Sequence, residues 1–228
     1  MWDAQDEKWM HYALSLARSS LGKTAPNPSV GCVIASGSVL VAQGATGPAG
    51  RPHAEERALE QAFASQSDRL GPLSLYVTLE PCSRRSNAHA MSCASLIAAS
   101  PIAYVFVACL DPFFGSPEDA NSWHDRQSIA LMETSGKQVR IGLCAPEAYA
   151  LNKGFFTRLE TGRPILVEIS ATGNESPDRF DAEFTLERGE TVDTALERLG
   201  KAGMTRVFVR AGSPVADAAR RAGLLAPL

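Results

Sequence analysis

Leu73-Ser-Leu-Tyr-Val-Thr-Leu-Glu-Pro-Cys82 is the stretch that decides the fold. Its first seven residues mostly favour β structure, so we expect a strand over residues 73–79 that ends at Glu80-Pro-Cys82. A cysteine at the carboxyl end of a strand lies where open α/β sheets bind ligands. A polar loop over residues 83–92 follows, and Cys93 begins a short helix expected to reach about residue 100.

His53 supplies a third metal-binding side chain. It follows a loop rich in Gly and Pro and precedes a helix expected over about residues 54–65. A zinc ion that activates water needs three protein ligands and one open position, and His with two Cys is one such set. We therefore predict that His53, Cys82 and Cys93 bind zinc. The alternative is a surface histidine and two buried cysteines that only pack.

Glu55, two residues after His53, is the predicted catalytic residue. A zinc hydrolase needs a nearby carboxylate that is not a ligand and that carries protons between water and substrate. His-x-Glu followed by Pro-Cys-x-x-Cys is typical of zinc deaminases, although ten residues separate the two cysteines here. The pattern predicts hydrolytic deamination of an amidine-like ring carbon, as in cytosine.

The whole chain has the composition of an ordinary globular protein. Its 228 residues suit one large domain or a domain with an appendage, and a formal charge of -3 gives no footprint for nucleic acid. Five cysteines without regular spacing argue against a secreted disulfide framework, and we recognise neither a secretory signal nor a membrane span. We expect a cytoplasmic protein that binds neither nucleic acid nor membranes.

Strands and helices alternate along the chain on short connections, which predicts a layered α/β sandwich. The apolar run over residues 102–110 is typical of a central strand covered on both faces. Arg163-Pro164 is a plausible boundary between domains at 1–162 and 163–228. Other strands are expected over residues 30–35, 39–42, 139–141, 165–169 and 206–209, and other helices over about 3–20, 125–135, 146–160, 191–202 and 214–222.

The chain resembles the deaminase half of the bifunctional riboflavin-biosynthesis deaminase–reductase. The matching segments are Thr24-Ala-Pro-Asn-Pro-Ser-Val-Gly-Cys32, Pro52-His-Ala-Glu55, Tyr76-Val-Thr-Leu-Glu-Pro-Cys-Ser83, Asp111-Pro112 and Leu151-Asn-Lys-Gly-Phe-Phe156. The resemblance implies a three-layer α/β/α, cytidine deaminase-like sandwich with a mixed central sheet, and it accounts for the long loop between the cysteines. It also implies a diaminopyrimidinone ribosylamino phosphate as substrate. Separately, we expect a homo-oligomer, a dimer or tetramer.

The resemblance further implies that Asn27 helps to hold the pyrimidine, unless it is only a turn residue. Arg84 and Arg85 suit a phosphate because guanidinium groups bind it through paired donors, but they are equally acceptable as solvated loop charges. The loop lacks the family's paired histidines, and Thr46 replaces another family histidine. These departures leave open a different nucleobase or nucleoside substrate, or a scaffold that keeps zinc for structure. A nucleic-acid editing deaminase is disfavoured by the lack of an aromatic and basic stripe.

The last 66 residues depart further from the family, which continues into a nicotinamide-dependent reductase. Glu168 stands near the position of the family's first-strand lysine, and Ala171-Thr-Gly-Asn-Glu175 replaces its Ser-Leu-Asp-Gly. The segment from Thr191 to Leu225 resembles the reductase's closing strand and helices, but the middle of that domain is absent. We therefore expect a short α/β remnant without reductase activity, which packs on the deaminase or contributes to a subunit interface.

Overall fold

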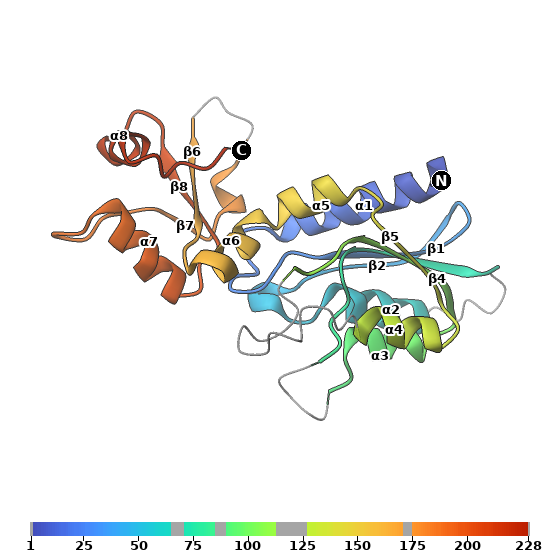
Figure 1. Ribbon diagram of the computed structural model, residues 1–228. Helices are drawn as coiled ribbons and strands as arrows, with labels where there is room; N and C mark the ends of the chain where they lie inside the picture. Colours follow the sequence, from blue (N-terminus) through green and yellow to red (C-terminus); the bar gives the residue numbers. More distant parts are fainter. Residues whose placement is uncertain (1, 65–70, 85–89, 113–126, 171–174, 228) are drawn as a thin grey trace. The chain divides into compact units, whose positions relative to one another are not determined.

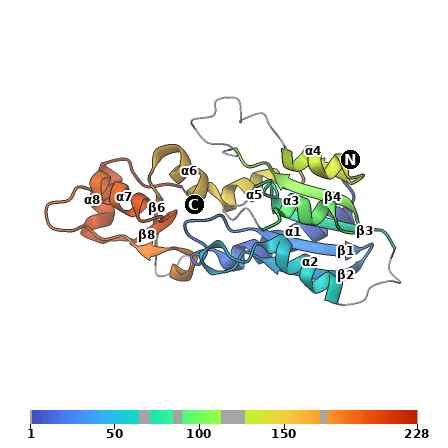
Figure 2. The same cartoon turned by 90° about the horizontal axis from the view of Figure 1, so that it is seen from below.

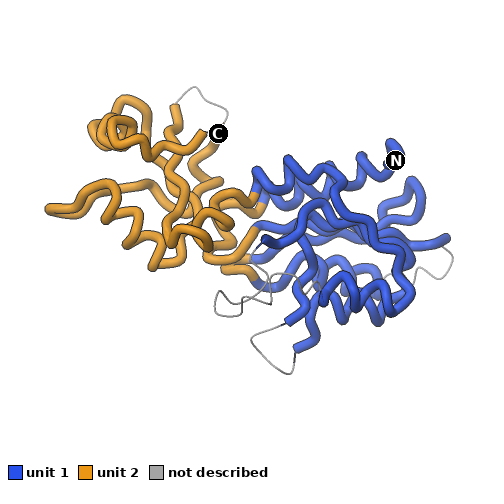
Figure 3. Tube along the Cα trace, in the orientation of Figure 1, with its two compact units in different colours: residues 1–19, 29–47, 51–151 blue, residues 20–28, 48–50, 152–228 orange. Residues whose placement is uncertain are grey.

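The computed structural model describes residues 2–64, 71–84, 90–112, 127–170 and 175–227. They form two compact units (Figure 3). The first unit comprises Met1–Ser19, Ser29–Gly47 and Arg51–Leu151. The second unit comprises Ser20–Pro28, Pro48–Gly50 and Asn152–Leu228. The last segment of the second unit begins at Asn152, before the domain boundary expected after residue 162. That functional boundary stays a prediction.

The first unit is built on a five-stranded mixed sheet in the order β2-β1-β3-β4-β5. β1 pairs antiparallel with β2 and with β3, whereas β3, β4 and β5 run parallel. The strands are β1 (Gly31–Ser36), β2 (Val39–Ala45), β3 (Leu73–Leu79), β4 (Ile102–Cys109) and β5 (Gln138–Ile141).

Helices cover both faces of this sheet. Figures 1 and 2 show α1 (Ala4–Ser20) and α5 (Ala145–Leu151) on one face. The other face carries α2 (Ala54–Ala64), α3 (Cys93–Ala98) and α4 (Gln127–Thr134). The prediction of a three-layer α/β/α sandwich is therefore confirmed, and β4 is a central strand as its apolar run indicates. No helix in the described part of the chain is both long and apolar enough to cross a bilayer.

The side chains of the central strands pack directly on each other and on α1. The rings of Tyr76 on β3 and Phe106 on β4 stack with centroids 4.6 Å apart and planes 9° from parallel. The Tyr76 hydroxyl donates to Asp6 Oδ1 of α1 at 2.9 Å. Burial, reinforced by this bond and by the negative charge of Asp6, raises the pKa of Tyr76, because each disfavours the phenolate.

One predicted helix is two helices. The helix expected over about residues 146–160 consists of α5 and α6 (Lys153–Thr161), which Asn152 separates. Asn152 has φ -98° and ψ 12°, outside the helical region, and only 3% of it is exposed. Asparagine adopts such conformations readily because its amide competes with helical hydrogen bonds, and the division between the two units falls just before it.

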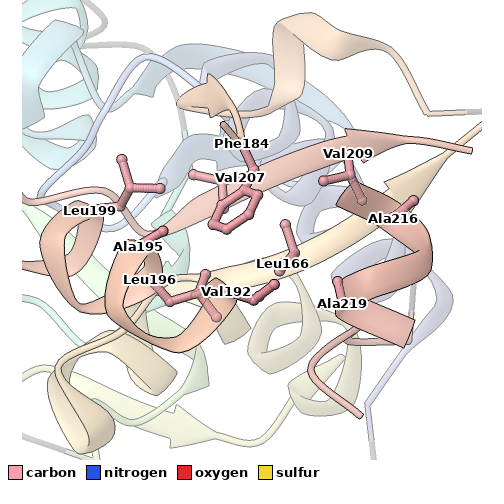
Figure 4. Close-up of a cluster of buried hydrophobic side chains, with 10 residues drawn as sticks. All are labelled: Leu166, Phe184, Val192, Ala195, Leu196, Leu199, Val207, Val209, Ala216 and Ala219. Atoms are coloured by element: carbon pink, nitrogen blue, oxygen red, sulfur yellow. The ribbon is translucent and has the colours of Figure 1, made fainter. Parts of the chain in front are cut away.

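The second unit has its own three-stranded parallel sheet, in the order β6-β8-β7. Its strands are β6 (Ile165–Ile169), β7 (Ala182–Glu183) and β8 (Arg206–Arg210). Besides α6 it contains α7 (Val192–Lys201) and α8 (Pro214–Arg221), as predicted, whereas the short β7 was not predicted. Figure 4 shows the core between these elements. Its members are Leu166, Phe184, Val192, Ala195, Leu196, Leu199, Val207, Val209, Ala216 and Ala219.

The close approach of β1 to α1 in the first unit generates a stability prediction. A Cβ at Gly31 would lie 1.9 Å from the carbonyl oxygen of Ala13, and backbone must move to make room for it. We expect Gly31→Ala to lower the free energy of unfolding by about 1–3 kcal/mol, measured by urea denaturation. Gly71→Ala is the matched control, because its Cβ would meet only Ser36 Oγ at 3.6 Å. Equal stability of the two variants would contradict the packing argument.

Candidate metal centre

Three elements of the first unit bring the predicted metal ligands together. His53 immediately precedes α2, Cys82 follows β3 and Cys93 is the first residue of α3. One nitrogen or sulfur atom from each lies within 4.8 Å of the other two. In the described part of the chain this is the one group of three or more such side chains that converges in this way.

The spacing of the donor atoms fits a tetrahedral zinc site. His53 Nδ1 lies 3.3 Å from Cys93 Sγ and 3.8 Å from Cys82 Sγ. Zinc bonds of about 2.0–2.1 Å to nitrogen and 2.3 Å to sulfur place tetrahedral N and S ligands about 3.6 Å apart. Three such donors leave a fourth position open. The residues present therefore fit zinc, and Nδ1 is the imidazole nitrogen that would bind it.

Backbone hydrogen bonds hold the two cysteines together. The Cys93 amide donates to Cys82 Sγ at 3.3 Å, and the Ala94 amide donates to the Cys82 carbonyl at 3.1 Å. Ser92 caps α3, with its hydroxyl accepting from the Ser95 amide at 3.1 Å. The first turn of α3 therefore holds Cys82 in place, although the two cysteines are eleven positions apart in the sequence.

His53 is held by the start of its own helix. The His53 amide donates to Glu56 Oε2 at 2.7 Å, which is the reach-back half of a capping box. Two residues further, Glu55 is only 4% exposed. A hydrogen bond connects its carboxylate with the Cys93 side chain, so Glu55 lies beside the three donor atoms.

The electrostatics of the cluster suit a metal ligand next to a proton carrier. A hydrogen bond from the Cys93 side chain, with smaller contributions from His53, lowers the pKa of Cys82 to about 4. The thiolate form of Cys82 is therefore favoured. Burial, reinforced by the negative charge of Cys82, raises the pKa of Glu55 to about 7. A carboxyl group that titrates near neutral pH can both accept and donate a proton under physiological conditions.

Glu80 and Ser128 form a buried brace that the sequence did not predict. Glu80 is 7% exposed, and its Oε1 accepts a hydrogen bond from the Ser128 hydroxyl in the first turn of α4. Its Oε2 accepts from the Asp111 amide at 3.3 Å. The Glu80 amide donates to the Cys109 carbonyl at 2.9 Å. The chain leading to Cys82 is thereby tied to the end of β4 and to α4.

The expected substrate residues fall in different places. Arg84 Nη2 donates to Gln127 Oε1 of α4 at 3.5 Å, while Arg85 and His89 lie outside the described residues. Asn27 belongs to the second unit, where its amide Nδ2 donates to the Ala49 carbonyl at 3.0 Å. The substrate contacts of Asn27, Arg84 and Arg85 therefore stay predictions.

Thr46, which replaces a family histidine, has a structural role. Its hydroxyl oxygen accepts from the Val30 amide at 2.9 Å, and its own amide donates to the Val30 carbonyl at 2.9 Å. The threonine is buried and closes the end of the β1–β2 pair. This side chain is therefore fully engaged with the backbone of the first unit.

Comparison with known proteins adds a family to this geometry. The family model described as the cytidine and deoxycytidylate deaminase zinc-binding region matches residues 3–109, which include all three donor residues and Glu55. The chain is 32% identical over 160 residues to the diaminohydroxyphosphoribosylamino-pyrimidine deaminase of Buchnera aphidicola subsp. Schizaphis graminum. That match covers 70% of this chain and 99% of the relative.

Longer relatives and a solved structure extend the comparison. The riboflavin biosynthesis protein RibD of Aquifex aeolicus is 37% identical over 161 residues, which are 71% of this chain and 41% of the relative. The chain spans about half or less of the length of such RibD relatives, 53% in Bacillus amyloliquefaciens. A deaminase/reductase structure from Thermotoga maritima superposes with a TM-score of 0.75 at 20% identity, covering 96% of this chain and 84% of that one. This likeness shows the shared fold.

The brace at Glu80 generates a prediction about metal affinity. Removing the hydroxyl in Ser128→Ala takes a donor from the buried Glu80 carboxylate and frees the chain that leads to Cys82. We expect zinc affinity, measured by competition with a chelator, to fall about tenfold, the usual effect of losing an outer-shell partner. Ser135→Ala is the control, because Ser135 lies just beyond α4 and its hydroxyl donates to the Met132 carbonyl instead of to Glu80. Lower stability with unchanged zinc affinity would reduce the brace to a purely structural role.

The lowered pKa of Cys82 predicts an unusual reactivity in the zinc-free protein. Because the thiolate is favoured, alkylation of Cys82 by iodoacetamide should persist as the pH falls and be half-maximal near pH 4. Cys144 is the internal reference: burial and then Glu147 raise its pKa, so its alkylation should begin only at alkaline pH. Site-resolved mass spectrometry measures both rates. Cys82 labelling that appears only above about pH 8, as for an ordinary thiol, would refute the assigned hydrogen bonding.

Proposed function

Because the chain belongs to the family of zinc-dependent deaminases that includes the diaminohydroxyphosphoribosylamino-pyrimidine deaminases, we propose that it hydrolyses the exocyclic amine of a pyrimidine nucleotide. The substrate that its relatives' names indicate is the diaminohydroxyphosphoribosylaminopyrimidine of riboflavin biosynthesis. The reaction converts a ring C–NH₂ and water into a ring carbonyl and ammonia. One observation carries the proposal. The buried Glu55 carboxyl lies beside one imidazole nitrogen and two cysteine sulfurs, and the distances among these three donor atoms fit a zinc ion.

In this proposal His53, Cys82 and Cys93 hold the zinc ion and Glu55 moves the protons. Bound zinc supplies a water molecule whose pKa is lowered toward neutrality. Glu55 accepts a proton from the attacking water and donates it to the ring nitrogen beside the attacked carbon. It then carries a second proton to the departing amine, which leaves as ammonia. A pKa of about 7 suits this two-way transfer.

The loop that starts at residue 83 is the proposed site of substrate selection. Arg84 donates to Gln127 through one exposed hydrogen bond at 3.5 Å among the described residues, and its guanidinium group carries further donors that suit an anion. We propose that Arg84 and Arg85 bind the substrate phosphate and that Asn27 contributes to pyrimidine binding. Thr46 cannot supply the imidazole of the family residue it replaces. A related nucleobase or nucleoside is therefore the alternative substrate class.

The second unit is proposed to lack reductase activity. Glu168 of β6 stands near the position where the family resemblance calls for a lysine, and its carboxylate pairs with Arg220 Nη2 at 2.5 Å. Because Glu168 is acidic, this position of β6 cannot offer a positive charge to a nicotinamide dinucleotide phosphate. We also propose a cytoplasmic homo-oligomer, dimer or tetramer, because exposed apolar side chains such as Phe63 of α2 and Leu131 of α4 are available for subunit contacts.

Substitution of the proposed proton carrier tests this function. Glu55→Gln keeps the size of the side chain but removes its basicity, so ammonia release from the diaminopyrimidine ribosylamino phosphate should fall about 10²–10⁴-fold. Zinc content should stay near one ion per chain. Glu60→Gln, an exposed substitution on the same helix, should leave the rate unchanged.

Two controls separate the alternatives. Cys82→Ala should lose zinc and activity together. Full activity of Glu55→Gln would refute the assigned role of Glu55. A zinc-loaded wild-type protein that releases no ammonia from this substrate, or from cytosine, guanine and their nucleosides, would instead support a non-catalytic zinc scaffold.

A further inference from the structure

The second unit contains a cavity that the deamination chemistry does not use. Its volume is about 640 Å³, it is open to solvent, and it is lined by residues of α6, the start of β6, α7 and residues 223–226. This volume falls within the range of about 300–1,000 Å³ typical of small-molecule sites. Every residue that lines it belongs to the second unit, whereas the metal ligands belong to the first.

Part of the cavity lining is apolar and is held by the core and the sheet of the second unit. Leu166 of β6 and Leu196 of α7 line it and belong to the buried core shown in Figure 4. Leu225, another lining residue, forms a parallel bridge with Leu166, and the Ala226 amide donates to the Leu166 carbonyl at 2.7 Å. The segment at residues 223–226 is therefore fixed as a wall by backbone hydrogen bonding to the sheet.

The charged residues at the cavity have an excess of positive charge. Three positively charged side chains line it, those of Lys153, Arg163 and Lys201. Glu197 is the one acidic side chain among the lining residues. Arg163 is already engaged, because it pairs with Asp193 at 2.7 Å and with Glu197. Lys153 and Lys201 have no carboxylate within ion-pair distance among the described residues, and the cavity keeps their two positive charges uncompensated.

The apolar lining and the two lysine side chains together favour one class of ligand. Lysine side chains lay their methylene groups along apolar surface and keep the ammonium group at the edge. An anionic group bound there would be attracted by both ammonium groups, while an apolar body would cover Leu166, Leu196 and Leu225. A purely inorganic anion would leave the apolar walls exposed to water, and a neutral ligand would leave the two charges unused.

We infer that this cavity is a binding site for an amphipathic organic anion, a molecule with a carboxylate, sulfonate or phosphate at one end and an apolar body. Lys153 and Lys201 bind the anionic end, and the leucine side chains bind the body. The site is independent of the proposed deaminase centre, since none of its residues lines or supports the metal ligands.

The probe that tests this inference is the fluorescent dye anilinonaphthalene sulfonate, compared with phenyl-naphthylamine, which has the same apolar body without the sulfonate. The zinc-loaded protein should bind the sulfonate saturably and the neutral dye more weakly. Each of Lys153→Gln and Lys201→Gln should weaken sulfonate binding about threefold, and the double variant about tenfold, as expected for partly exposed charge pairs. Binding of the neutral dye should not change.

Two further variants locate the effect. Thr157→Phe places a larger side chain in the cavity wall and should abolish binding of both dyes. Arg188→Gln removes an exposed positive charge of the same unit outside the cavity and should have no effect. Sulfonate affinity that is unchanged in the double lysine variant, or equal affinity for the two dyes, would overturn the inference, as would absence of saturable binding. Ammonia release by the lysine variants should equal that of the wild type.

Discussion

The candidate metal centre depends on the hydrogen bonds that the first turn of α3 donates to Cys82. The amides of Cys93 and Ala94 donate to the sulfur and the carbonyl of Cys82, so a residue after β3 and a residue eleven positions later share one location. A hydrogen bond from the Cys93 side chain, with a smaller contribution from the Cys93 amide, lowers the pKa of Cys82 and favours its thiolate. Sheet, loop and helix therefore have to be in place before the two sulfurs and His53 Nδ1 reach zinc-binding distances. The long loop between the cysteines is compatible with the site because its two ends, and not its length, determine the geometry.

Two opposed requirements meet at Glu55. A ligand cluster rich in thiolate favours a cation, whereas the neighbouring carboxyl group has to be able to hold a proton. Burial in the first turn of α2 meets the second requirement by raising the pKa of Glu55 to about 7. Glu80, also buried, is instead surrounded by donors from Ser128 and Asp111 and acts as a brace. Two buried glutamates 25 positions apart thus take different roles because their hydrogen-bond partners differ.

The convergence of His53, Cys82 and Cys93 and the layered sheet could be predicted because their signals are local, whereas the role of Glu55 stays a prediction. His53 and Glu55 are two positions apart at the start of a helix, and Cys82 follows a strand whose β-favouring residues are evident in the sequence. The contact between Ser128 and Glu80 was not predictable, because the two residues are 48 positions apart and Ser128 belongs to no motif. The break at Asn152 was missed because apolar residues continue across it, and the two residues of β7 are too few to show a period.

Zinc-edge X-ray absorption on the zinc-loaded protein tests the central claim most directly, because it reports the ligand atoms themselves. The account predicts two sulfur scatterers at about 2.3 Å, an imidazole nitrogen at about 2.0–2.1 Å and one further light atom. Loss of one sulfur in Cys93→Ser, with the imidazole signal kept, would assign the second thiolate. A first shell made only of nitrogen and oxygen, or one without imidazole scattering, would contradict a centre built from His53, Cys82 and Cys93.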